Sequence, residues 1–210
     1  MTEPEKKTPV WKNPFVVAFV IGAAALTALP LMQRRFLKAP PPLRPLGAWE
    51  LTTPTGERVG AAALRGKVFI VQALPAGCMP GCAARLEAQG SLERHLEDLG
   101  DKVLLVTVVV PVEGAETFGK TFAAKHSNRW LFLSGSPAEV DLVADRGLRV
   151  ALLGWGRADA GTTALEFSSL PSFSLVDQNG DVRGFWAQDE LGRGNLINAA
   201  RLLAKAGPSP

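Results

Sequence analysis

Two long apolar runs constrain the fold of this chain more than any other feature. Residues 67–74 read KVFIVQAL, and residues 102–110 read KVLLVTVVV. Both runs are short, continuous and rich in β-branched residues, which favours strands buried on both faces. Residues 82–99, CAARLEAQGSLERHLEDL, carry leucines at helical spacing and predict a helix between them. This strand–helix–strand order predicts an α/β fold with parallel strands covered by helices.

The rest of the chain extends the same alternating pattern. Short edge elements are predicted at WELTT and RVGAAAL, a helix at AETFGKTFAAKH and a strand at RWLFLSG. Ser136–Glu139 has the pattern of a capping box and predicts a helix from about Pro137 to about Asp145. The stretch SFSLVDQNGDVRGFWA predicts two strands joined around Asn179–Gly180, and GNLINAARLLAKA predicts a closing amphipathic helix. We therefore expect a mixed sheet flanked by helices.

A separate segment near the N-terminus indicates a membrane anchor. Residues 14–32 contain no charged side chain, and as a helix they would span about 28 Å, close to the hydrocarbon thickness of a bilayer. They exceed the apolar region of a signal peptide, and a bulky basic stretch follows instead of a small-residue cleavage site. We expect an uncleaved transmembrane helix at 14–32, preceded by a tail at 1–13.

Charge does not decide which side of the membrane the rest of the chain faces. Basic residues flank the span on both sides: Lys6, Lys7 and Lys12 before it, and Arg34, Arg35, Lys38 and Arg44 after it. Residues 33–47 are basic and rich in proline, which favours an extended, semi-rigid spacer. The folded domain is then expected at 48–207. The net charge of +3 is spread along the chain, which argues against a nucleic-acid partner.

The two cysteines of the chain, Cys78 and Cys82, lie between the predicted strand 67–74 and the predicted helix 82–99. A helix N-terminus stabilises an anion, so a thiolate is favoured there and its pKa falls. The spacing of four residues puts both sulfurs on one face if the first turn is helical. Such a pair suits a reversible disulfide and also Cu(I). The alternatives are a structural disulfide, although closing so short a loop removes little chain entropy, and a pair of small buried cysteines.

The order of these pieces resembles the Sco/SenC family of membrane-anchored, thioredoxin-like proteins. The resemblance lies in the anchor, LRGKV, the Cys-x-x-x-Cys motif, VLLVTVVVP, WLFLSGSP and FSLVDQNGDVRGFW. It implies a thioredoxin-like fold and copper binding through the two cysteines and one histidine. It also implies a role in assembling the copper centre of cytochrome c oxidase, or in thiol–disulfide reduction in that pathway.

The sequence departs from the family pattern at the third copper ligand. The family's histidine stands eight residues before the position that opens the hairpin turn, and counting back from Asp177 gives Ser169. Met79 and Ala83 stand where the family usually has a proline after each cysteine. The thioether of Met79 is a candidate soft ligand for Cu(I); the alternative is simple packing.

Other residues bear on the choice between a copper site and a redox site. Pro171 precedes the predicted strand of the hairpin, and it resembles the cis proline beside the thiols of thioredoxin-like reductases; an ordinary strand-entry proline is the alternative. The only histidines are His95 and His126. His95 is expected on a solvated helix face about 20 Å from Cys82, and His126 follows a different helix, so neither is expected to replace the missing ligand.

Three functions therefore remain open from the sequence. The first is copper handling for assembly of cytochrome c oxidase, and the second is a thiol–disulfide oxidoreductase without stable copper. The third is a non-catalytic accessory subunit of a membrane complex. Each has the membrane and a client protein as partners. Because disulfides and copper transfer belong outside the cytoplasm, we expect a single-pass protein of the inner membrane with its domain on the extracytoplasmic side.

Overall fold

The computed structural model divides the chain into two compact units, Met1–Lys38 and Ala39–Pro210. It describes residues 13–36, 38–74, 83–109, 121, 125–143 and 173–207. The predicted helix over AETFGKTFAAKH falls mostly outside these residues.

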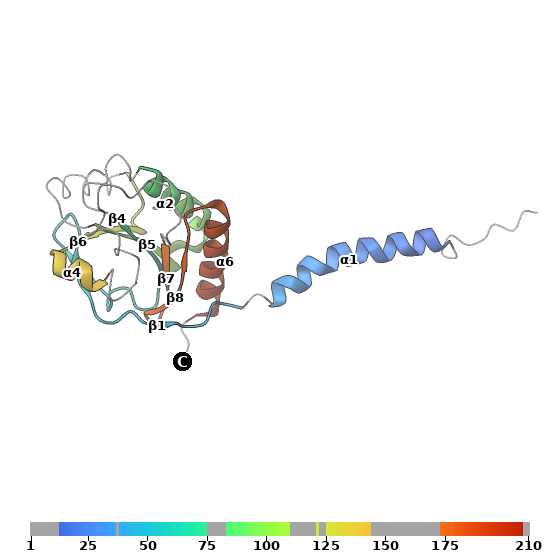
Figure 1. The fold of residues 1–210 in the computed structure, drawn as a ribbon, viewed down its shortest axis with the longest axis horizontal. Coiled ribbons are helices and arrows are strands. Elements are labelled where there is room, and N and C mark those ends of the chain that lie inside the picture. The colour runs from blue at the N-terminus through green and yellow to red at the C-terminus, as the bar shows by residue number, and fades with distance from the viewer. Residues whose placement is uncertain are drawn as a thin grey trace, which may run out of the picture. The chain divides into compact units, whose positions relative to one another are not determined.

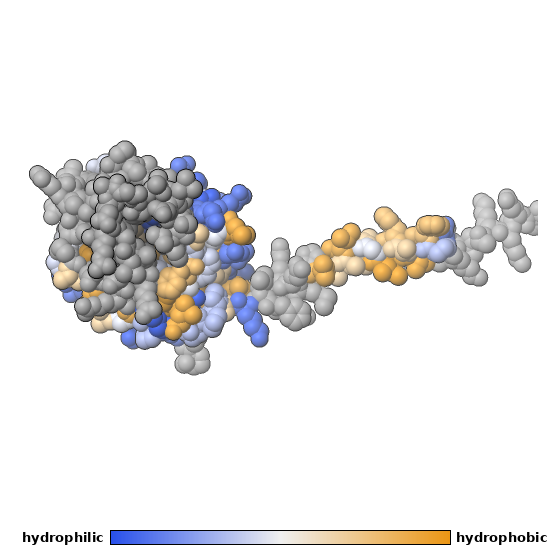
Figure 2. All heavy atoms as spheres, viewed as in Figure 1, coloured by the Kyte–Doolittle hydropathy of each residue, from blue (hydrophilic) through white to orange (hydrophobic). Residues whose placement is uncertain are grey.

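The described part of the first unit contains the helix α1 (Pro14–Phe36). The Asn13 side chain caps it by accepting a hydrogen bond from the backbone N–H of Phe15 at 3.0 Å. Most of its described apolar side chains are exposed, among them Phe15, Phe19, Ile21 and Leu26, and Figure 2 shows orange spheres along this helix. Among the residues that the structure describes, no helix combines the length and the apolar character of a membrane span.

The second unit is built on one eight-stranded sheet with the strand order β1-β8-β7-β4-β5-β6-β2-β3. The strands are β1 (Arg44–Pro45), β2 (Glu50–Thr52), β3 (Arg58–Gly60), β4 (Val68–Leu74), β5 (Val103–Val109), β6 (Trp130–Ser134), β7 (Phe173–Val176) and β8 (Asp181–Trp186). The helices are α2 (Ala83–His95), the 3₁₀ helix η2 (Glu97–Lys102), α4 (Pro137–Asp141) and α6 (Glu190–Ala206).

The centre of the sheet is parallel, as the two apolar runs predicted. β4 pairs in parallel with β5, and β5 pairs in parallel with β6. All residues of β4 and β5 are buried, because helices or loops cover both faces of these strands. β7 and β8 form the predicted antiparallel hairpin, and β7 pairs with β4. The prediction of a mixed sheet flanked by helices is confirmed.

The sheet separates two apolar cores. Val68, Ile70 and Leu74 of β4 pack with residues of α2 and α6 on one face. Phe69 and Val71 alternate with them and pack on the other face, where α4 lies. Figure 1 shows α2 and α6 together on one side of the strands and α4 on the other.

Two helix boundaries differ from the sequence prediction. α2 ends at His95, and the predicted stretch to residue 99 continues as η2, which bends at Gly100 with a φ of 53°. α6 begins at Glu190 rather than 194, because Asp189 caps it by accepting from the backbone N–H of Gly192 at 2.7 Å. The capping box predicted at Ser136–Glu139 is present and begins α4.

The end of the proline-rich stretch belongs to the sheet rather than to a free spacer. β1 pairs with β8, and the backbone N–H of Leu43 donates to Val182 O at 2.8 Å. Leu46 is buried in the core, and Arg183 donates to Pro40 O at 2.8 Å. A strand of two residues carries little hydrophobic pattern, which is why the sequence did not reveal it.

Candidate functional site

The residues that the sequence singles out for chemistry lie outside the described residues. This holds for Cys78, Met79 and Cys82, and also for Ser169 and Pro171. The structure does describe the elements that lead into and out of both segments. Their positions locate the candidate site on the sheet.

The three parallel strands end together at one edge of the sheet. Leu74, the last residue of β4, pairs with Val109 of β5, and Val109 pairs with Ser134 of β6. The segment 75–82 with both cysteines follows Leu74 directly, and α2 begins after it at Ala83. The cysteine segment thus connects the carboxyl end of a central strand to the N-terminus of a helix, a position where α/β folds commonly bind ligands.

The segment with Ser169 and Pro171 enters the sheet at this same edge. β7 is antiparallel to β4, and Ser174 near its start pairs with Val71 near the end of β4. Pro171 precedes Phe173, the first residue of β7, by two positions. We call this boundary, where β4, β5 and β6 end and β7 begins, the thiol edge.

Buried polar side chains lie just inside the thiol edge. Gln72 of β4 and Thr107 of β5 pair in register, and both are fully buried. The indole N–H of Trp130 donates to Thr107 Oγ1 at 2.8 Å, and Thr107 Oγ1 donates to Gln89 Oε1 of α2 at 2.8 Å. A chain of hydrogen bonds therefore runs from β6 through β5 to the helix that follows the cysteines.

This polar cluster is incompletely paired. Among the described residues, neither the Nε2 nor the Oε1 atom of Gln72 has a hydrogen-bond partner, and the Nε2 atom of Gln89 has none either. Both side chains have no exposed surface. Leaving a buried polar group unpaired costs about 1–3 kcal/mol, so these amides lower the stability of the fold at this edge.

The electrostatics at the start of α2 favour an anion. The first turn of α2 carries no acidic side chain, so nothing there opposes the positive end of the helix dipole. Arg85 lies in this turn, and burial lowers the pKa of its guanidinium. Positive charge of this kind stabilises a thiolate.

Both histidines are held in contacts away from the thiol edge. His95 is exposed at the end of α2, with its Nδ1 atom 2.7 Å from Ser91 O. His126 Nδ1 lies 3.2 Å from Glu93 Oε2, and its ring stands 4.4 Å from that of Trp130. Among the described residues, no three side chains of histidine, cysteine, aspartate or glutamate gather as a metal site.

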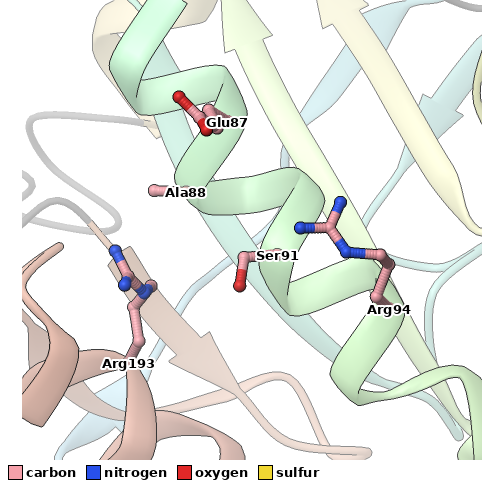
Figure 3. Close-up of a pocket in the computed structure, with 5 residues that line it drawn as sticks. All are labelled: Glu87, Ala88, Ser91, Arg94 and Arg193. Atoms are coloured by element: carbon pink, nitrogen blue, oxygen red, sulfur yellow. The ribbon is translucent and has the colours of Figure 1, made fainter.

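A groove of about 220 Å³ lies between α2 and α6. Figure 3 shows Glu87, Ala88, Ser91 and Arg94 on α2 and Arg193 on α6. Arg193 also donates to Gln188 O at 2.7 Å. The groove carries both signs of charge and contains no group with obvious chemistry, so it does not define a site by itself.

Sequence reasoning missed the buried polar cluster. The available signal was a glutamine within VFIVQAL and a threonine within VLLVTVV. Each stands two residues before the end of its strand, and the parallel register brings them side by side. A polar residue inside a run that is buried on both faces has no solvent to meet its hydrogen bonds, which marks it for attention.

The fold is that of thioredoxin-like proteins, with a mixed sheet and helices on both faces. Residues 39–204 match the family model described as SCO1/SenC. The chain therefore belongs to the SCO1/SenC family. A comparison of the sequence with curated proteins gave no match.

Solved structures share the fold at low sequence identity. One is BsSco, described as a member of the Sco family of cytochrome c oxidase assembly proteins with a disulfide switch; it is 18% identical, with a TM-score of 0.61, and the match covers 80% of this chain and 98% of that one. For ScoI of Bradyrhizobium japonicum with copper bound, the identity is 21%, the TM-score is 0.52 and the coverage is 74% and 96%. Yeast Sco1 with copper bound is 15% identical, with a TM-score of 0.53, and the match covers 77% of this chain and 94% of that one.

Proposed function

We propose that this protein handles copper for the assembly of cytochrome c oxidase, with Cys78 and Cys82 as the residues that hold the ion. The observation that carries the proposal is the position of the cysteine segment in a SCO1/SenC chain. It joins the end of β4 to the N-terminus of α2, where the dipole and Arg85 favour thiolates. Copper is then cargo that the protein receives and passes to a client.

The donor set determines which oxidation state of copper the protein would hold. Two thiolates are soft ligands that suit Cu(I). Cu(II) favours nitrogen and oxygen donors, and Ser169 stands where the family has its histidine. A serine hydroxyl is a weak donor for either ion. We therefore propose Cu(I) binding that depends on both cysteines, together with little stable Cu(II) complex.

A copper titration of the reduced, anaerobic protein tests this proposal. The wild type should take up one Cu(I), and Cys78→Ser and Cys82→Ser should each lose it. Ser169→His should gain a Cu(II) complex with a thiolate-to-copper absorption band. A strong Cu(II) band in the wild type would contradict the proposal and would direct attention to Met79 or His126.

A thiol–disulfide oxidoreductase is the second candidate, because the missing histidine removes a copper ligand but leaves both thiols. Two thiols would reduce a disulfide of a client, losing two electrons and two protons to it and forming the Cys78–Cys82 disulfide. Pro171 before β7 is compatible with this role. Mass spectrometry after alkylation, with and without reductant, would detect the disulfide; two alkylated thiols under every oxidising condition would exclude it.

The location of the protein forms part of the proposal. Residues 14–32 lack charge, and Phe15, Phe19, Ile21 and Leu26 of α1 are exposed. We propose that α1 anchors the chain in the inner membrane, with the domain on the extracytoplasmic side. An impermeant thiol reagent should label the cysteines in intact cells under reducing conditions. Labelling only after lysis would contradict this topology.

A further inference from the structure

The chain enters the folded domain along the outer edge of β8. We call residues 39–46, which lead into the sheet, the strap. The backbone N–H of Leu43 donates to Val182 O at 2.8 Å, and that of Leu46 donates to Gly180 O at 2.9 Å. The two residues of β1, which lie within the strap, pair antiparallel with the first two residues of β8. The second half of the strap is thus fixed to the hairpin.

The rest of β8 extends beyond β1. Among the residues that the structure describes, no strand pairs with Arg183–Trp186 on the side away from β7. Phe185 and Trp186 are half-buried there, and they pack against the two different cores of the sheet. An edge strand that combines a row of unpaired backbone groups with apolar side chains is a template for another strand. This stretch of β8 is therefore an interaction surface unless something covers it.

The first half of the strap covers this stretch with residues that cannot extend the sheet. The antiparallel direction of β1 carries the preceding residues alongside the rest of β8. Arg183 Nη1 donates to Pro40 O at 2.8 Å, and Ala39 packs against the same core as Trp186. Residues 40–42 are all prolines, which have no N–H to donate to a strand. Natural sheets protect their edges in this way, with prolines and very short strands.

Two buried contacts hold the strap in this position. Leu46 at its end is buried in the core on the α4 face of the sheet. Arg183 is nearly buried, and its Nε atom donates to the Asp177 carboxylate at 2.6 Å while its Nη1 atom donates to Pro40 O. Leu43, between these two contacts, is exposed. The strap is thus a docked cover that leaves β8 only when its buried contacts are broken.

We infer that the strap covers the outer edge of β8 and so prevents this edge from pairing with the same edge of a second copy of the chain. A second copy is the fitting partner, because the same strand edge on two identical chains can pair antiparallel about a twofold axis. Residues 183–186 of the two copies would then join their sheets into one. The inference concerns a surface away from the cysteines and does not depend on copper or thiol chemistry.

The test compares two variants that remove the cover with one that leaves it docked. Leu46→Ser removes the buried contact at the end of the strap. The combination of Pro40→Gly, Pro41→Ser and Pro42→Gly removes the prolines but keeps the length of the strap, β1 and Leu46. Leu43→Ser is the matched control, because Leu43 belongs to the same strap but is 55% exposed.

The readouts are sedimentation equilibrium and amide hydrogen exchange of the full chain in detergent micelles. The wild type and Leu43→Ser should show the same self-association constant. Leu46→Ser and the triple proline variant should each associate at least about tenfold more tightly, since new cross-strand pairs form. In these two variants, the amides of residues 183–186 should exchange more slowly as the protein concentration rises, because the strand of the second copy then binds them.

Each alternative result would overturn the inference. Association constants equal to that of the wild type in both release variants would show that the strap does not prevent pairing. Tighter association without protection of residues 183–186 would mean that the copies meet at another surface. An equal gain in Leu43→Ser would show that displacement of the strap is not the cause. Should Leu46→Ser fail to fold, the triple proline variant, which leaves the core unchanged, gives the same test.

Discussion

The two ends of β4 differ in how completely their buried polar groups are hydrogen-bonded. At the end where β4 begins, the Asp177 carboxylate accepts from the backbone N–H groups of Asn179 and Asp181, each at 2.9 Å, and from Arg183 Nε at 2.6 Å. Gln178 donates to Leu203 O at 2.8 Å, one of the last carbonyls of α6. We call this end of the sheet, where β4 begins and β7 turns into β8, the hairpin edge.

At the thiol edge, by contrast, buried amide atoms of Gln72 and Gln89 find no hydrogen-bond partner within the part of the chain that the structure describes. The same sheet thus contains one end where each buried glutamine or carboxylate is paired and one end where pairing is incomplete. Satisfied polar groups at the hairpin edge hold the hairpin and α6 in place. Unsatisfied donors are retained at the end where chemistry is expected, since functional sites often sacrifice stability.

The largest effect that would test this contrast is expected from Asp177→Ala. The side chain of Asp177 is 2% exposed and that of Arg183 is 11% exposed, so the substitution leaves a nearly buried cation without its carboxylate and frees two turn N–H groups. The loss should be about 3–5 kcal/mol of unfolding free energy, measured by urea denaturation. The surface variant Asp98→Ala is the control, since its pair with Arg201 is exposed. A loss below 1 kcal/mol would show that the hairpin edge does not hold the fold.

A smaller loss is expected from Thr107→Val. This change keeps the shape of the side chain but removes the acceptor for Trp130 and the donor for Gln89 together. The unfolding free energy should fall by about 2–3 kcal/mol. Thr107→Ser preserves the hydroxyl and should lose less. Equal losses in the two variants would mean that packing of the methyl group, and not the hydrogen bonds, explains the effect.

The two glutamines should then differ in the sign of their effect on stability. Gln178→Leu removes the hydrogen bond to Leu203 O and should cost about 1–2 kcal/mol. Gln72→Leu removes from the core two amide atoms for which the described residues offer no partner, and the unfolding free energy should stay the same or rise. Both are measured in the same urea titration. A clear destabilisation by Gln72→Leu would mean that its amide has a bonding partner in the folded protein.

The smallest effect concerns acid stability at the far end of α2. Burial opposes ionisation of Glu93, but hydrogen bonds from Ser127 and His126 outweigh it and hold the pKa of Glu93 below its usual value. The stability that this ionised carboxylate contributes is therefore present above the usual glutamate pKa. It is lost as the pH falls through the lowered pKa of the folded state.

Urea denaturation between pH 6 and pH 3 measures this contribution. The wild type should lose unfolding free energy toward acid, and Glu93→Gln should lose less over the same range. The substitution Glu97→Gln on the exposed surface nearby is the control. Parallel curves for wild type and Glu93→Gln would show that ionisation of Glu93 does not contribute to the loss of stability in acid.

The sequence predicted the parts of the fold that depend on long periodic patterns. β4, β5 and β6 came from continuous apolar runs, the hairpin from Asn179–Gly180, and the start of α4 from its capping box. It did not predict β1, which depends on pairing with β8 and not on its own residues. Nor did it predict the end of α2 at His95, since the following leucines continue into η2 with helical spacing.

The sequence predicted the cysteine motif of the candidate site but not the buried polar cluster beside it. The cysteine pair is visible as a motif, and the strand before it and the helix after it were correctly anticipated. The buried cluster was not, because Gln72, Gln89 and Thr107 come from three elements that only the parallel register and the packing of α2 bring together. The sequence marks Gln72 and Thr107 as polar residues inside buried runs, but it does not show that they meet each other and Gln89.

The short strand β1 determines how far the domain can reach from its tether. With α1 held in a membrane, as proposed, any pull on the domain passes through residues 39–46 to two paired residues of β1, an edge strand that can be peeled away one bond at a time. These eight residues would add up to about 28 Å when extended. Leu46 packs in the same core as Phe69 and Val71 of β4, so a pull that freed residues 39–46 would also withdraw Leu46 from that core as the domain extended toward a client.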